Sequence, residues 1–253
     1  MAGSVPLIEV FSSFQGEGPR VGERQVFVRL AKCDLRCAFC DTPESYPTPK
    51  QARVERVADE DGDDLLDNPV SIGAILEAIA RLDAPRGLHR SVSITGGEPL
   101  LHPDAVRAIA FGARALGLRV HLETGGHRPK ELQDVIQAID EATPDVKLES
   151  ATGFPTPWEK HRECYAILER AKKALAVKAV VGATTTEAEV ERAARFCAEY
   201  LPSAPLILQP ATPYGDGPAA PSAVLLRRLH AAAARVHPSV RVIPQTHRLI
   251  AAR

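Results

Sequence analysis

The chain has 253 residues, 45% of them hydrophobic and 25% charged, and these are the proportions of an ordinary globular protein. Its 31 basic residues nearly balance 32 acidic ones, so the net charge does not argue for a nucleic-acid surface. With this charge balance we expect no nucleic-acid partner. No run of about 18 apolar residues occurs, so we expect no membrane partner, and the first residues do not resemble a signal peptide, so we expect a cytoplasmic location.

Short apolar runs alternate with amphipathic segments along the chain. Most of the runs are continuous rather than alternating, as in strands buried on both faces, and they are 26–31, 92–95, 119–123, 145–148, 175–181, 205–209 and 240–245. The segments between them have helical spacing, and they are 71–82, 103–116, 130–142, 158–173, 186–201 and 221–237. Strands that alternate with helices predict a largely parallel sheet, and this number of units favours the α/β fold of an incomplete parallel (β/α) barrel. We expect one domain over residues 1–253.

The interval 43–70 departs from this pattern. It holds four prolines and an acidic run at 59–64. We expect a solvated, partly mobile surface insertion there and assign it no chemistry.

Polar clusters follow nearly every predicted strand. In a parallel barrel the strand ends lie at one rim, where active sites are built, so we expect these clusters to line one site. They include 33–42, 95–99, 123–126, 147–150, 209–213 and 245–247, with Lys178 inside the fifth strand.

Three cysteines, Cys33, Cys37 and Cys40, fall within eight residues. A structural zinc site normally needs four ligands in two pairs, and no second pair exists because Cys164 and Cys197 are single residues on amphipathic helices. We interpret those two as core residues. Three thiolates can hold a [4Fe–4S] cluster that leaves one iron without a protein ligand. A zinc site is the less favoured alternative.

The spacing Cys-x3-Cys-x2-Cys, with Phe39 before the last cysteine, resembles the signature of the radical S-adenosylmethionine superfamily. The resemblance implies an incomplete barrel, with S-adenosylmethionine bound to the open iron of the cluster as the source of a radical that abstracts a substrate hydrogen. The run Gly96-Gly97-Glu98-Pro99 is similar to the motif of that superfamily that contacts the methionyl amine.

Other features resemble one family within it, the 7-carboxy-7-deazaguanine synthases. They are FSSFQGEG at 11–18, Arg29 before the cysteines, Asp41-Thr42 after them and Gln245-Thr246-His247 near the end. The resemblance implies that 6-carboxy-5,6,7,8-tetrahydropterin is contracted to 7-carboxy-7-deazaguanine with loss of ammonia, and that Mg²⁺ is required.

The resemblance also implies roles for individual residues. Those expected at the pterin are Phe14, Gln15, Gly16, Arg29, Thr95, His247 and Arg253, with Glu123 and His247 as catalytic residues. Those expected at S-adenosylmethionine are Phe39, Cys40, Asp41, Gly96, Gly97, Glu98, Lys147, Leu148, Glu149, Ser150, Lys178, Gln209, Pro210, Ala211 and Thr212. The metal ligands are expected to be Cys33, Cys37 and Cys40 for iron and Thr42 for Mg²⁺.

Simpler interpretations remain for several of these residues. Arg29 would serve equally in a structural ion pair, Thr42 as a helix N-cap or turn residue, and His247 as a solvated histidine. Lys147 and Lys178 would serve as surface lysines at strand ends. Three departures from the family are the sequence Lys147-Leu148-Glu149-Ser150, which aligns loosely, the end of the chain at Arg253, and the interval 43–70, which has no assigned counterpart.

Two rival functions share part of the pattern. An activating enzyme that installs a glycyl radical on a protein needs the cysteines and the GGEP run, but not the FQGEG loop, Arg29 or Thr42. An electron-transfer or structural iron–sulfur protein predicts a fourth cysteine ligand. For the synthase we expect an electron donor such as flavodoxin or ferredoxin, and the resemblance suggests a homodimer.

Overall fold

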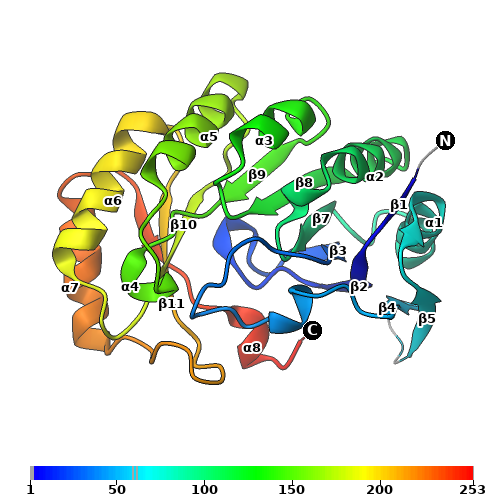
Figure 1. The fold of residues 1–253 in the computed structure, drawn as a ribbon, viewed down its shortest axis with the longest axis horizontal. Helices are drawn as coiled ribbons and strands as arrows, with labels where there is room; N and C mark the ends of the chain where they lie inside the picture. The colour runs from blue at the N-terminus through cyan, green and yellow to red at the C-terminus, as the bar shows by residue number, and fades with distance from the viewer. Residues whose placement is uncertain (1–2, 59, 61, 253) are drawn as a thin grey trace.

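The computed structural model describes residues 3–58, 60 and 62–252 (Figure 1). Its strands form a curved sheet in two parts, and its longer helices form an arc outside the sheet (Figure 1). The predicted fold class, an incomplete parallel (β/α) barrel, is confirmed.

The larger part of the sheet has seven strands in the order β5-β4-β2-β3-β7-β8-β9. Strands β3, β7, β8 and β9 run parallel, whereas β2 is antiparallel to β3 and β5 is antiparallel to β4. The apolar residues of β3, β7 and β8 are buried, which explains why these strands form the centre of the molecule. Their bounds are β2 Leu7–Phe14, β3 Arg24–Leu30, β4 Gln51–Glu55, β5 Asp63–Asp67, β7 Ser91–Gly96, β8 Arg119–Thr124 and β9 Glu141–Pro144.

A parallel three-stranded part continues this curve. It consists of β10 Val177–Val181, β11 Leu206–Pro210 and β12 Val240–Val242. Single parallel bridges, Ala142 to Ala174 and Asp145 to Lys178, connect it to the region of β9. Two short strands, β1 Ser4–Val5 and β6 Val70–Ser71, pair with each other outside the barrel.

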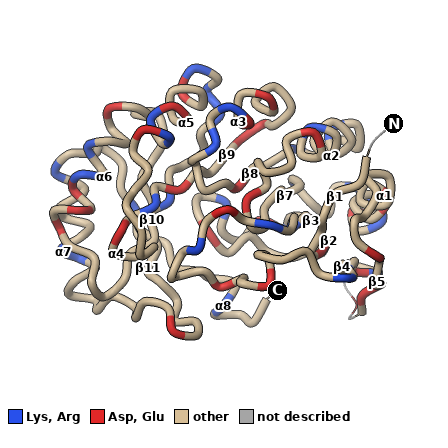
Figure 2. The backbone as a smooth tube through the Cα atoms, in the orientation of Figure 1, with Lys and Arg blue, Asp and Glu red and all other residues tan. Residues whose placement is uncertain are grey.

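The longer helices pack side by side in chain order around the outer face (Figure 1). Ser71, Thr186 and Ser222 accept hydrogen bonds from the first turns of α1, α6 and α7, so these helices begin at capped residues. Basic and acidic residues are interspersed along the helices (Figure 2). None of the helices in the described ranges has the length and apolar character needed to cross a membrane. Their bounds are α1 Ile72–Leu82, α2 Pro103–Ala115, α3 Pro129–Val135, α5 Trp158–Ala171, α6 Glu187–Tyr200 and α7 Ala223–Ala234, with the short α4 Glu149–Thr152 and α8 Thr246–Leu249 and the 3-10 turns η1 Gly18–Arg20, η2 Pro43–Ser45 and η3 Pro99–Leu101.

Three expectations about the elements need correction. The interval 43–70 contributes β4 and β5 to the sheet and buries Ala52 and Val54, so it is not a wholly solvated insertion. The strand expected at 145–148 lies earlier, at Glu141–Pro144, and the helix expected at 130–142 ends at Val135. The reason for both shifts is Glu141, the first residue of β9. An acidic residue favours an exposed helix position in the sequence, but in the fold Glu141 is buried in the strand and pairs with Arg20 and Arg119.

Candidate active site

The polar residues that follow the parallel strands gather around two adjoining pockets. Because carboxyl ends of parallel strands meet at one rim, residues far apart in the sequence share these walls. The first pocket has a volume of about 840 Å³ and the second of about 1300 Å³. Residues that line both are Glu17, Arg29, Asp41, Thr42, Thr95 and Glu123.

The three clustered cysteines line the first pocket. All three thiols are free and partly exposed, on the loop that follows β3. Burial raises the pKa of Cys33 to about 11 and also raises the pKa of Cys37, so a thiolate at either position needs positive charge beside it. In the described ranges no three His, Cys, Asp or Glu side chains are grouped as ligands of a single metal ion. The thiols instead lie along one wall.

Gly96, the last residue of β7, and Gly97 after it let that strand end lie directly on the cysteine loop. A Cβ at Gly97 would overlap the carbonyl of Lys32 and the Cβ of Cys33, and Gly96 has a φ of 138°. The N–H of Glu98 donates to the Lys32 carbonyl at 2.8 Å. Glycine is therefore required where this strand end meets the first cysteine.

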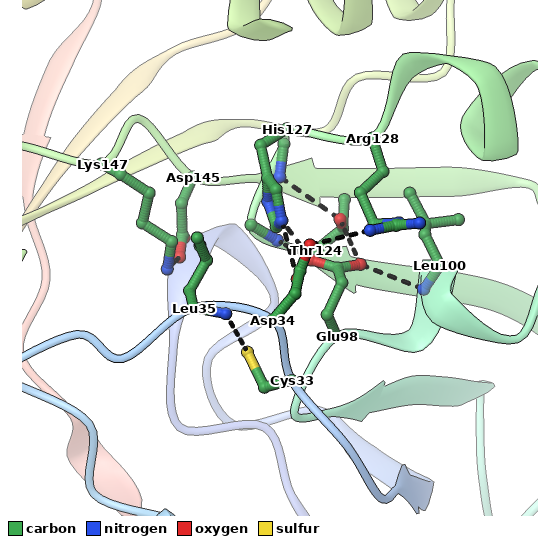
Figure 3. Close-up of polar contacts among 12 residues, drawn as sticks. Cys33, Asp34, Leu35, Glu98, Leu100, Thr124, His127, Arg128, Asp145 and Lys147 are labelled. Carbon is green, nitrogen blue, oxygen red and sulfur yellow. Dashed lines mark hydrogen bonds and ion pairs between the residues drawn. The ribbon is translucent and has the colours of Figure 1, made fainter. Parts of the chain in front are cut away.

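The carboxylate of Glu98 is buried and fully engaged. It accepts hydrogen bonds from the N–H of Gly125, the hydroxyl of Thr124 and the N–H of Leu100, at 2.8, 2.8 and 3.0 Å (Figure 3). Glu98 therefore fastens the end of β7 to the end of β8.

A buried row of alternating charges forms another wall of the first pocket. The Lys178 Nζ lies 2.5 Å from Glu17 and 3.6 Å from Asp145, and the Lys147 Nζ lies 2.5 Å from Asp145. Burial disfavours the ammonium groups, but the two carboxylates outweigh it and raise the pKa of both lysines. Their side chains are 10% and 13% exposed, so the interpretation of Lys147 and Lys178 as surface lysines is wrong.

The FQGEG loop and the last helix, α8, contact each other at the second pocket. A Cβ at Gly16 would overlap the ring of His247, and the N–H of Thr246 donates to the Gly16 carbonyl at 2.9 Å. Burial lowers the pKa of His247, so it is not the solvated histidine of the simpler interpretation. Phe14, Gln15 and Gly16 line this pocket with it.

Glu123 and Arg29 lie on the wall between the pockets. The Glu123 Oε1 accepts from the Ser93 hydroxyl at 2.8 Å and from the Gln15 amide at 2.9 Å. The Arg29 Nε donates to Glu9 at 2.9 Å, and within the described ranges no other hydrogen bond uses this guanidinium. Arg29 thus has the structural ion pair of the simpler interpretation and also faces both pockets.

Thr42 also faces both pockets. It is the N-cap of the short turn η2, but its side chain makes no capping hydrogen bond, and its hydroxyl lies 3.9 Å from the Cys40 sulfur.

Several expected site residues do not line either pocket. Leu148 is a core residue, and Ser150 bonds to Thr185 and Glu189 on the outer side of α4. Ala211 packs with Phe39, which itself lines the first pocket. Arg253 lies outside the described residues. Those absent from both walls are Leu148, Glu149, Ser150, Gln209, Pro210, Ala211 and Thr212.

Sequence reasoning missed two carboxylates of the first pocket. Glu17 is the only acidic residue of the FSSFQGEG run, and Asp145 is the only acidic residue of the run 145–148, at its first position. A single acidic residue in each segment was therefore the available signal. Their lysine partner, Lys178, lies 161 residues from Glu17, and no local pattern indicates such a pairing.

Comparison with known proteins places the chain in a family. The family profile described as the Radical SAM superfamily matches residues 28–197. A 7-carboxy-7-deazaguanine synthase from Geobacter sulfurreducens is 39% identical over 249 residues, which cover 96% of each chain. The chain belongs to the 7-carboxy-7-deazaguanine synthase family of radical SAM proteins. A synthase from Methanopyrus kandleri is 35% identical over 96% of this chain and 92% of the relative.

Solved structures support the fold of this radical SAM family member. QueE from Escherichia coli superposes with a TM-score of 0.59 at 20% identity and covers 96% of this chain and 94% of its own. Streptococcus suis SuiB, in a structure bound to S-adenosylmethionine, gives a TM-score of 0.58 at 17% identity over 95% of this chain and 51% of its own.

Radical SAM membership implies a [4Fe–4S] cluster and S-adenosylmethionine, and the residues present fit both. Three free thiols on one wall are the donor set that such a cluster takes, because each thiolate binds a different iron. The rest of the first pocket offers carboxylates, ammonium groups and close backbone, which suit the polar groups of S-adenosylmethionine.

Proposed function

We propose that this chain is a 7-carboxy-7-deazaguanine synthase. It converts 6-carboxy-5,6,7,8-tetrahydropterin to 7-carboxy-7-deazaguanine with loss of ammonia, in the 7-deazapurine pathway to queuosine. The observation that carries the proposal is the wall shared by the two pockets, where Arg29, Thr95 and Glu123 face the cysteine side and the FQGEG side together. The curated relatives that match nearly the whole chain bear this name.

In this proposal the first pocket holds the cofactors. Cys33, Cys37 and Cys40 hold the [4Fe–4S] cluster, and Gly97 and Lys178 contact S-adenosylmethionine. When bound, these groups supply the radical that abstracts a hydrogen atom from the substrate. The buried charges of Lys147 and Lys178 are matched by those of Asp145 and Glu17, so the pocket wall holds no unpaired lysine before the cofactor binds.

The second pocket then holds the pterin. Glu9 takes the Nε hydrogen of Arg29, so the Nη groups bind the substrate carboxylate in a charge-assisted pair. The Oε1 of Glu123 is occupied by Ser93 and Gln15, and its other oxygen accepts from the N–H groups of the pterin. His247 closes the pocket over Gly16.

Mg²⁺ fits the boundary between the pockets. The Thr42 hydroxyl lies there and makes no capping hydrogen bond to η2. A hard cation takes oxygen ligands of this kind from the protein and the substrate. We assign Thr42 as its protein ligand.

The proposed enzyme needs an electron donor such as flavodoxin or ferredoxin and works as a cytoplasmic homodimer. The electron donor and the homodimer rest on the family resemblance.

The deciding experiment is anaerobic incubation of cluster-replete protein with 6-carboxytetrahydropterin, S-adenosylmethionine, a reductant and Mg²⁺. We expect 7-carboxy-7-deazaguanine by mass spectrometry, together with a change in the cluster spectrum when S-adenosylmethionine is added. A cluster spectrum that does not respond would refute the radical assignment. A response without the deazaguanine would refute the synthase and favour the glycyl-radical activating enzyme.

A further inference from the structure

The segment that carries the first two cysteines has few ties to the rest of the fold. Within the described ranges no backbone hydrogen bond joins residues 33–36 to another element. The Leu35 N–H bonds to the Cys33 sulfur. The Arg36 side chain donates to carbonyls of the same segment, and its guanidinium lies over the Tyr46 ring, 4.2 Å from the ring centroid. What holds this segment must therefore come from side chains.

Asp34 supplies such a tie, because its carboxylate points away from the Cys33 thiol toward the loop after β8 (Figure 3). One oxygen lies 3.0 Å from the His127 Nε2 and the other 2.7 Å from the Arg128 Nη1. Asp34 stands directly after Cys33, so a fixed Asp34 backbone also limits where the Cys33 sulfur lies.

His127 is the buried partner in this contact. Its side chain is 3% exposed, compared with 23% for Arg128. Its other nitrogen faces Glu98 at 3.7 Å, and a Cβ at Gly125 would lie 2.8 Å from that nitrogen and 3.1 Å from Glu98. The imidazole thus fills the space between Asp34 and the carboxylate that fastens the ends of β7 and β8 together.

We propose that His127 is a positioning residue that holds the Cys33–Cys37 segment in its cluster-binding arrangement through Asp34. It touches neither the thiols nor the substrate pocket, and it acts by seating the loop on the rigid end of β8. The inference rests on the proposed ligation of the cluster by Cys33, Cys37 and Cys40.

The first test needs no cluster. Amide hydrogen exchange of the full-length apo chain, read on peptides that cover residues 31–42, should be about tenfold faster in His127→Ala than in the unaltered chain. His127→Gln should restore slow exchange, because its amide can donate to Asp34. His237→Ala, which removes a histidine that is also buried, should leave this segment unchanged.

The second test uses the reconstituted protein. Loss of the cluster absorbance to an iron chelator should be about tenfold faster in His127→Ala, and near the original rate in His127→Gln. Asp34→Ala, which also releases Arg128, should have at least this effect, and the double variant Asp34→Ala/His127→Ala should be no worse than Asp34→Ala alone. If His127→Ala does not fold, Asp34→Ala compared with His127→Gln carries the same test.

Unchanged exchange and unchanged cluster loss in His127→Ala would overturn the inference, as would additive effects in the double variant. A chain that keeps its cluster but makes no deazaguanine would overturn the proposed function and leave this inference standing.

Discussion

His247 lies so close to Gly16 that any side chain at Gly16 would overlap its ring, although the two residues are far apart in the sequence. The same contact includes a backbone hydrogen bond from Thr246 to Gly16. The FQGEG loop and the last helix are therefore seated on each other at the second pocket.

We expect Gly16→Ala to displace His247 and to raise the KM for the pterin by at least about tenfold, which corresponds to about 1.4 kcal/mol of lost binding. Gly73→Ala, in helix α1 where the added Cβ meets only the Ser71 hydroxyl at an ordinary contact distance of 4.0 Å, should leave KM unchanged. Steady-state kinetics of both variants are the measurement. If the clash with His247 is the cause, the KM of the double variant Gly16→Ala/His247→Ala is no higher than that of His247→Ala alone.

The cysteines should divide into two classes. Cys40 lines the first pocket, whereas Cys164 is fully buried on α5, where burial raises its pKa to about 12. Cys40→Ala should lose the cluster and all turnover, and Cys164→Ala should keep both, at a modest cost in stability for the lost packing. Iron content and product formation are measured after anaerobic reconstitution. Equal losses in the two variants would contradict the ligand assignment.

The ion pair between Lys178 and Glu17 should be costly to break from one side. Lys178→Met leaves Glu17 buried without its cation, and we expect the free energy of unfolding to fall by about 3 kcal/mol. The pair Lys178→Met/Glu17→Gln should recover most of this loss, because no unpaired charge remains there. Urea unfolding followed by circular dichroism measures both. A double variant as unstable as the single one would show that packing, not charge, is responsible.

Local patterns predicted the parts of the fold that local forces determine. Strands such as β3 and β11 contain continuous apolar runs, at 26–28 and 206–208, and the cysteines lie within one loop, so both are visible in the sequence. Strand β2 was missed because Glu9 and Ser13 interrupt its apolar residues. These polar groups are buried, and Glu9 is matched by Arg29 and Arg53, which only the folded sheet brings together.

The same limit applies to the site. Except for Glu17, the residues on the shared wall were predicted because each motif is short, but the contacts that orient them join distant segments. Asp34 and His127 lie 93 residues apart, and Glu123 and Gln15 lie 108 residues apart. Spacing along the chain carries no information about such pairs, since they form only when strand ends meet at one rim.

His161 gives the chain an acid-sensitive element behind the site. Its ring is fully buried, with Nδ1 2.7 Å from the Gly126 carbonyl and Nε2 accepting from the Lys147 N–H at 3.2 Å. Burial lowers its pKa to about 4 from an ordinary 6.5, so the folded state keeps the ring neutral while the unfolded chain takes up a proton. The stability that this residue contributes is complete above pH 6.5 and is lost as the pH falls toward 4, by about 3 kcal/mol in all.

His161→Gln keeps a donor and an acceptor but does not titrate, so its urea midpoint should fall less steeply between pH 6.5 and 4 than that of the unaltered chain. Parallel pH curves for the two proteins would mean that other buried histidines, such as His121, whose pKa burial also lowers, cause the acid loss instead.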